Sequence, residues 1–202
     1  MKYAEQSMTE FLGNLSSQTP APGGGSASAL VGALGAALLG MVAHYTREKV
    51  SHTGLASEIK MILMESHRLR ERLTRLIDED IQNYLEVCRA RRTAKILAKQ
   101  LSRKRLVHRA LRKALASSLS ICKASHRGLL VSKRLFQIGN ENLKSDAKAA
   151  SYFFIASFQA ALLMCEINAK WLKDRRLSKR TREILIPLRK DVQRRMKEFC
   201  KT

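Results

Sequence analysis

One acidic residue stands where the helical pattern of this sequence predicts an apolar side chain. Asp80 lies three residues after Ile77 and four before Tyr84, on the same helical stripe as Leu69 and Leu73. An acid on a core-facing stripe is costly unless it is paired or neutralised, and such groups often have shifted pKa values and chemical roles. Two interpretations remain open: a proton-transferring carboxyl, or a structural partner of one of the many basic side chains.

Two further polar residues belong to a helix expected over 147–172. Asn168 continues an apolar seam that ends at Cys165, so its amide must find hydrogen-bond partners in the core. Asp146 follows Ser145 at the expected start of that helix, where an acid usually caps the helix or faces its dipole. For Asp146 the residues alone favour capping.

Three glycines precede a segment that has few large side chains. Gly23, Gly24, Gly25 and Ser26 would present backbone N–H groups at the positive end of a helix, which suits an anion or a polar ligand edge. The segment is not a P-loop, because the G-K-[ST] ending is absent and no strand precedes it. On spacing alone, a turn rich in left-handed glycines, with Ser26 or Ser28 as the helix cap, is the better interpretation.

The elements that must position these residues all read as helices. No segment shows sustained period-two alternation, and apolar residues recur at helical spacing. The expected helices cover 4–16, 26–45, 55 into the nineties, 103–138, 147–172 and a basic C-terminal stretch from about 175–178, with Pro187 expected to kink or split the last. We therefore expect an all-α fold: one domain over 1–202, built as a single bundle of about six or seven helices.

The stretch 27–45 is nearly long enough and uncharged enough to span a bilayer. It consists mainly of Ala, Gly and Ser, however, and its small residues recur every four positions, for example Gly32, Ala36 and Gly40. That spacing lets neighbouring backbones approach closely in membrane and soluble helices alike. We interpret the stretch as a central bundle helix and expect no membrane partner.

The cysteines and the first twenty residues bear on the cellular compartment. Cys88, Cys122, Cys165 and Cys200 are far apart and form no C-x-x-C pair, which indicates neither a zinc site nor a disulfide framework. The first twenty residues contain acids and polar groups and no apolar signal core. We expect a cytoplasmic setting and no metal.

The charge of the chain is strongly and unevenly positive. Lys and Arg number 38 against 17 Asp and Glu, a net charge of +21, yet residues 1–60 carry four basic and four acidic side chains. No acid occurs from Val87 to Asn140. Such a field attracts polyanions, whether nucleic acid, anionic lipid or a substrate with an anionic tail. A solvated basic face that only aids solubility is the alternative.

Four segments, in order, resemble motifs of the cyclodeaminase/methenyltetrahydrofolate cyclohydrolase family. They read TPAPGGGSASALVGALGAALLGMVAHYT, LIDEDIQNY, GNENLKSDAKAA and EINAKWLKD, and the resemblance extends from Phe11 to Asp174. It implies a cyclodeaminase-like helical bundle that forms a homodimer. It also implies an enzyme of folate one-carbon metabolism, either formiminotetrahydrofolate cyclodeaminase or methenyltetrahydrofolate cyclohydrolase.

The resemblance also implies roles for particular residues. Asp80 would be the catalytic acid/base, and Arg89 and Arg92 would hold the polyglutamate tail of the folate. Arg89, Arg91 and Arg92 follow Asp80 by two to three helical turns, about 14–18 Å, which is a plausible distance for such a tail. The substrate-binding residues would be Gly23, Gly24, Gly25, Ser26, Asn140, Asn142, Asp146 and Asn168. No metal is implied, and no cofactor beyond the tetrahydrofolate substrate.

The chain departs from the family pattern in two places. TREKVSH retains only Lys49 of a Gly-Lys-Lys element, and CRARRTAKILAKQ stands where a Leu-Pro-Lys element is expected. This divergence could have altered or removed the activity. The alternative function is a non-catalytic basic helical protein that binds nucleic acid or another polyanion, which the scarcity of aromatic residues makes less favoured.

Overall fold

The computed structural model describes residues 2–50, 54–96 and 100–199, and every regular element in these ranges is helical. The α-helices are α1 (Met8–Ser16), α2 (Gly24–Val50), α3 (Ala56–Ile96), α4 (Gln100–Ile138), α5 (Lys144–Leu172) and α6 (Arg175–Phe199), with short 3-10 turns η1 (Tyr3–Glu5) and η2 (Glu141–Leu143). The predicted all-α fold is confirmed. Cys200 lies outside the described residues.

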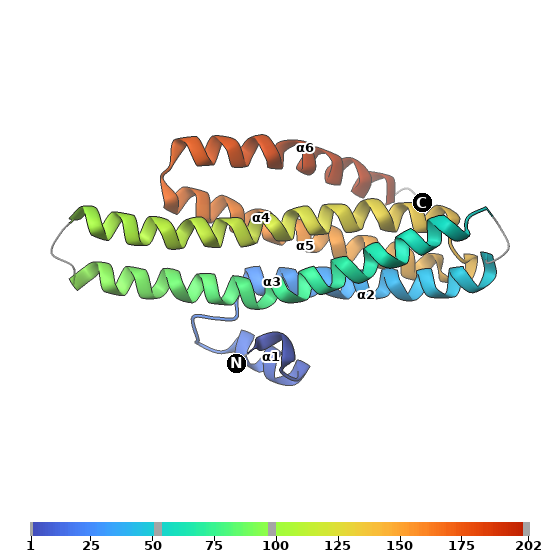
Figure 1. Ribbon diagram of the computed structural model, residues 1–202, viewed down its shortest axis with the longest axis horizontal. Coiled ribbons are helices and arrows are strands. Elements are labelled where there is room, and N and C mark those ends of the chain that lie inside the picture. Colours follow the sequence, from blue (N-terminus) through green and yellow to red (C-terminus); the bar gives the residue numbers. More distant parts are fainter. Residues whose placement is uncertain (1, 51–53, 97–99, 200–202) are drawn as a thin grey trace.

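Helices α2 to α5 form a four-helix bundle (Figure 1). Each of them contacts two neighbours in a ring that runs α2, α3, α4, α5 and back to α2. The core between them is filled by large apolar side chains that are almost completely buried, among them Leu73, Leu76, Ile121, Phe154 and Phe158. Helices α3 and α4 are longer than α2, so their connected ends project beyond the point where α2 begins (Figure 1).

The small residues of α2 allow its neighbours to approach closely. A Cβ added to Gly32 would lie 2.7 Å from the hydroxyl of Ser157 on α5 and 3.1 Å from a methyl of Leu73 on α3. By length and composition alone, Gly24–Lys49 and Glu141–Leu172 could each cross a membrane, and 56% and 44% of their apolar windows are buried inside the bundle. Both helices serve as core helices of the bundle.

The N-terminal segment forms two elements, η1 and α1, whereas one helix over 4–16 was expected. Ser7 accepts a hydrogen bond from the Glu10 backbone while Glu10 accepts one from the Ser7 backbone, a capping box that starts α1 afresh. Asp78 on α3 accepts hydrogen bonds from the backbone N–H groups of Tyr3, at 2.6 Å, and Ala4, at 3.3 Å. These contacts fix η1 against α3.

Helix α6 lies along the outside of α4 and α5 (Figure 1). Its buried side chains are Thr181, Leu185, Val192 and Phe199, and Asp191 accepts hydrogen bonds from His126 of α4 at 2.9 Å and from Arg195 at 2.7 Å. The expected split at Pro187 is wrong, because α6 continues through this residue. Pro187 is exposed, so the backbone carbonyl that loses its helical partner can be solvated.

Candidate active site

A pocket of about 350 Å³ lies where α2 begins. Its walls come from the segment Pro20–Gly25, from Asp80, Ile81 and Tyr84 on α3, from Ala114 on α4, and from four residues between Met164 and Trp171 on α5. Most of the lining is apolar. The pocket therefore has the size and character of a small-molecule site with few convergent polar groups.

Asp80 supplies the carboxyl group of this pocket. The backbone N–H of Ser26, in the first turn of α2, donates a hydrogen bond to it. The hydroxyl of Ser117 on α4 lies 3.5 Å from its Oδ1. The carboxyl thus faces the positive end of α2, which stabilises a negative charge there.

Burial governs the acidity of Asp80. Removal of the carboxyl from water raises the pKa of Asp80 to about 6, although the hydrogen bonds from Ser26 and Ser117 act to lower it. A carboxyl with this pKa exists in both protonation states near neutral pH. It can accept or donate a proton at little cost, as an acid/base group must.

The glycine segment fits tightly against this carboxyl. A Cβ on Gly25 would lie 2.3 to 2.5 Å from the carboxyl atoms of Asp80, whereas a Cβ on Gly23 would meet nothing within 4 Å. Ser26 is inside the helix, and its hydroxyl accepts from the Gly23 N–H at 3.0 Å and donates to the Gly23 carbonyl at 2.9 Å. The expected left-handed turn is wrong, because none of the described glycines has a positive φ. Position 25 therefore requires glycine, because a side chain there would collide with the carboxyl of Asp80.

Asn168 and Tyr84 provide polar groups beside Asp80. The side-chain amide of Asn168 is buried and donates to the hydroxyl of Ser118 at 3.3 Å, the core partner that the sequence required. Tyr84 lies one turn after Asp80, and burial raises the pKa of its phenol, which therefore remains a hydrogen-bond donor. Both residues line the pocket.

Trp171 and Arg91 stand at one end of the pocket; Arg91 was predicted to lie at a plausible distance for a folate tail, whereas Trp171 was not among the predicted site residues. Trp171 lines the pocket, and the guanidinium carbon of Arg91 lies 4.5 Å from the centre of a Trp171 ring. Arg91 follows Asp80 by eleven residues, about three helical turns, so it lies on the same face of α3 at about 16 Å. This distance for Arg91 was predicted from the sequence, and the four-residue spacing could have identified Tyr84 as a pocket residue.

Arg89 and Arg92, the two residues expected to hold a polyglutamate tail, do not line the pocket. At about 100° per residue, Arg89 lies on the side of α3 opposite Asp80 and Arg92 lies about 120° away. Both are exposed, and Arg89 donates a weak hydrogen bond to the Leu85 carbonyl at 3.4 Å. The geometry favours Arg91 over both as the cation nearest the pocket.

Asn140, Asn142 and Asp146 lie near the other end of the bundle. Asn140 donates from its backbone to Thr46, and its side-chain oxygen accepts from Lys49 at 3.0 Å, both on the last turns of α2. Thr46 and Lys49 follow Gly25 along α2 by 21 and 24 residues, which separates this cluster from Gly25 by about 32–36 Å. The expectation that Asn140 and Asn142 share a cleft with Asp80 is therefore wrong within one chain, and Asp146, in the first turn of α5, is remote from that cleft as well.

The described residues contain no group of three or more His, Cys, Asp or Glu side chains arranged to hold a metal ion. The polar chemistry of the pocket is thus that of one acid with a raised pKa, one amide, one phenol and the N–H groups at the start of α2. Such a set can bind a flat polar heterocycle and move a single proton.

Comparison with known proteins identifies relatives along almost the whole chain. The family model described as formiminotransferase-cyclodeaminase matches residues 7–185. The chain is 32% identical over 171 residues to methenyltetrahydrofolate cyclohydrolase of Methylorubrum extorquens, covering 84% of this chain and 82% of that protein. It is 27% identical to rat formimidoyltransferase-cyclodeaminase and spans 33% of that longer protein.

A solved structure has the same fold. The crystal structure of formiminotetrahydrofolate cyclodeaminase from Thermotoga maritima superimposes with a TM-score of 0.87 at 25% sequence identity, covering 98% of this chain and 95% of that one. The bundle and its long α3–α4 hairpin therefore correspond to an arrangement seen experimentally.

Proposed function

The chain belongs to the formiminotransferase-cyclodeaminase family, and from this premise we propose that it makes or opens the one-carbon bridge of a tetrahydrofolate, with Asp80 as the proton-transfer group. The observation that carries this proposal is the carboxyl of Asp80 inside an apolar pocket, against the start of α2. The names of the relatives support a folate one-carbon enzyme.

Two reactions use the same bridge. In cyclodeamination, N10 of protonated 5-formiminotetrahydrofolate attacks the formimino carbon, its proton passes to the departing nitrogen, and ammonia leaves the methenyl cation. In the cyclohydrolase reaction, water adds to the bridging carbon of that cation, the bond to N5 breaks, and a proton is released with 10-formyltetrahydrofolate. Each reaction moves a proton beside a delocalised cation, and neither needs a cofactor beyond the folate.

Asp80 is suited to both tasks. Its ionised form offsets the positive charge of the methenyl or formiminium group, and its oxygen can accept the proton of N10 or of the attacking water. Because burial raises the pKa of Asp80 to about 6, the neutral acid is also accessible and can return the proton to a leaving nitrogen. The N–H groups at the start of α2 and the amide of Asn168 would hold polar edges of the pterin.

The volume of the pocket indicates how a folate would lie in it. About 350 Å³ accommodates a bicyclic heterocycle, and the rest of the molecule would extend along the face of α3 that carries Tyr84 and Arg91. Arg91 lies about 16 Å from Asp80 along the helix, where it could pair with a glutamate carboxylate. The indole of Trp171 packs against the guanidinium and would restrict its position.

We propose that a second copy of the chain covers the outer face of α2 and α5, which are neighbours in the bundle. Large apolar side chains are exposed there, including Leu34 and Tyr45 on α2 and Tyr152, Phe153 and Leu163 on α5. Exposed large apolar side chains on neighbouring helices are typical of an interface. Sedimentation should give a dimer, and the double change Leu34→Glu with Leu163→Glu should give monomers. A wild-type monomer at micromolar concentration would contradict this assignment.

The test of the proposed function is an assay of the purified chain with each folate. We expect consumption of 5,10-methenyltetrahydrofolate, followed by loss of its absorbance, or formation of this compound and ammonia from 5-formiminotetrahydrofolate. The cyclohydrolase relative has the higher sequence identity, 32%, so the first reaction is the one to measure first. Rates equal to those in buffer for both compounds would overturn the proposal.

A further inference from the structure

A row of basic side chains lies on the face of α4 that points away from the pocket. Lys104, Arg105, Arg109 and Arg112 are exposed and line a shallow groove on this helix; we call these four residues the α4 basic row. At 100° per residue, its three arginines lie about 160–220° around α4 from Ala114, the residue that α4 contributes to the pocket. The three arginines and the candidate active site are therefore on opposite sides of the helix, whereas Lys104 lies about 80° around α4 from Ala114.

No carboxylate neutralises the α4 basic row. The two nearby acids are engaged elsewhere, Glu86 with Lys113 at 2.8 Å and Asp174 with His108 at 3.3 Å. In the part of the chain that the structure describes, none of the four residues of the row has an ion-pair partner within 4 Å. The positive field of the row is therefore uncompensated.

The turn between α5 and α6 extends this charged surface. The contact between His108 and Asp174 holds this turn beside the row, and Lys173 and Arg175, which flank Asp174, are exposed. The start of α6 and the start of α4 lie toward the same end of the molecule (Figure 1). The cations of α4 and those of the turn between α5 and α6 thus lie on one surface.

We propose that the α4 basic row binds the phosphate backbone of a nucleic acid duplex, a function separate from folate chemistry. From Lys104 to Arg112 the row is about 12 Å long. Each strand of a DNA duplex carries one charge per about 3.4 Å of the axis, so about three or four phosphates of one strand would face the row. A folate tail leaving the pocket would emerge on the other side of α4, so the row does not serve that tail.

The composition of the surface favours a duplex over a single strand. Proteins that hold single strands stack the bases on aromatic side chains, and no Phe, Trp or Tyr occurs between residues 87 and 135. Contacts from Lys and Arg to phosphates position a duplex without reading its sequence. The proposed binding is therefore independent of sequence and strongly dependent on salt.

The experiment measures fluorescence anisotropy of labelled 20-base-pair duplexes, one of DNA and one of RNA, with the full chain between 50 and 200 mM salt. Four phosphate contacts predict a slope of about −3.6 for log K against log salt, or about a 150-fold loss of affinity over this range. In the triple variant Arg105→Gln, Arg109→Gln, Arg112→Gln, the slope should become shallower by about 2.7. Equal binding of the DNA and RNA duplexes would identify phosphate as the shared ligand. Tighter binding of one duplex would show which type of nucleic acid the row prefers.

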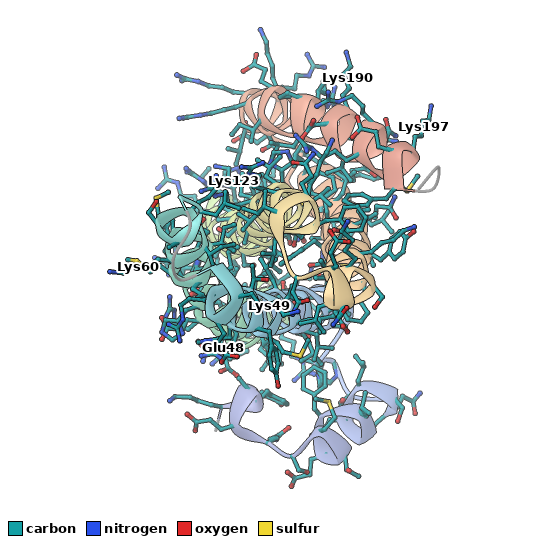
Figure 2. The ribbon with its side chains drawn as sticks, turned by 90° about the vertical axis from the view of Figure 1, so that its right-hand side faces the viewer. Glu48, Lys49, Lys60, Lys123, Lys190 and Lys197 are labelled. Carbon is teal, nitrogen blue, oxygen red and sulfur yellow. The ribbon has the colours of Figure 1, made fainter. Side chains whose placement is uncertain are left out.

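The matched control removes three charges elsewhere. Lys60 on α3 and Lys190 and Lys197 on α6 are exposed, and Figure 2 shows their side chains directed outward. The control variant with all three changed to Gln has the same net charge as the triple variant and should bind within threefold of wild type. Should the triple variant lose helical content, Arg109→Gln alone should make the slope shallower by about 0.9.

Three results would overturn the proposal. They are equal affinity of the triple and control variants, tighter binding of a single strand or of a poly-γ-glutamate peptide than of the duplex, and duplex binding displaced by vesicles containing phosphatidylserine. Asp80→Asn should bind duplexes as wild type does, because Asp80 lies in the pocket on the other side of α4. Loss of folate turnover and loss of duplex binding are therefore separate outcomes.

Discussion

Asp80→Asn should make the folded protein more stable at neutral pH, and the gain should depend on pH. Burial raises the pKa of Asp80 from the ordinary aspartate value of about 3.9 to about 6. The folded state therefore binds this proton more tightly than the unfolded state does. The protonated carboxyl stabilises the folded state relative to the unfolded state. This contribution is fully present below about pH 4 and is lost as the pH rises through 6.

The size of the effect follows from the shift. A difference of about 2 pKa units at 1.36 kcal/mol each gives about 3 kcal/mol between the protonated and ionised forms. Asparagine has the same shape, can accept the Ser26 hydrogen bond and carries no charge. Because part of this difference is already present at pH 4.5, the stability of Asp80→Asn relative to wild type should rise by about 2 kcal/mol between pH 4.5 and 7.5.

Urea denaturation followed by circular dichroism at pH 4.5, 6.0 and 7.5 measures this difference. The matched control is Glu79→Gln, because Glu79 is the adjacent residue, about 40% exposed, and paired with Arg72 at 2.6 Å. Its change should cost less than about 1 kcal/mol, with no rise across this pH range. A constant stability difference between Asp80→Asn and wild type from pH 4.5 to 7.5 would refute the desolvation of the carboxyl.

Three other changes test neighbouring features. Gly25→Ala should displace Asp80 and reduce folate turnover at least tenfold, whereas Gly23→Ala, which has open space, should retain it; equal rates would contradict the packing of Gly25. Arg91→Met should raise KM for a glutamate-bearing folate about tenfold with little change in kcat, and an unaltered KM would remove its assigned role. Hydrogen-bonded neighbours lower the pKa of Asp191 despite the opposing effect of burial, so Asp191→Asn should destabilise the fold by about 1–2 kcal/mol at neutral pH in thermal unfolding. That cost should fade as the pH falls below about 4, and a cost that persists there would argue against the charged contacts.

The helices could be predicted from the sequence because their apolar residues recur with one period along the chain. The stripe through Leu73 and Ile77 also located Asp80, since an acid on such a stripe has to face the interior. The same reasoning placed Asn168 in the core, where it pairs with Ser118. Pro187 was misjudged because a proline on an exposed helix face leaves its unpaired carbonyl accessible to water.

Distances across the bundle could not be predicted in this way. Asn140 and Asn142 were grouped with the glycine segment because their motifs resemble those of one family, but such a resemblance does not show whether the motifs meet within one chain. Contacts between helices were also hidden, and Ser117 reaches Asp80 from α4 without any local pattern that marks it. Arg91 was named with Arg89 and Arg92 on distance alone, and helix geometry could have separated it from them, because eleven residues return a helix to the same face.

The most direct test of the central claim compares turnover of 5,10-methenyltetrahydrofolate and 5-formiminotetrahydrofolate by wild type, Asp80→Asn and Glu79→Gln. Acid/base groups contribute about 10²- to 10⁴-fold to rate. Asp80→Asn should therefore lose at least about a hundredfold in kcat while its helical circular dichroism is unchanged, and Glu79→Gln should stay within threefold of wild type. Full turnover by Asp80→Asn would contradict the role of this carboxyl.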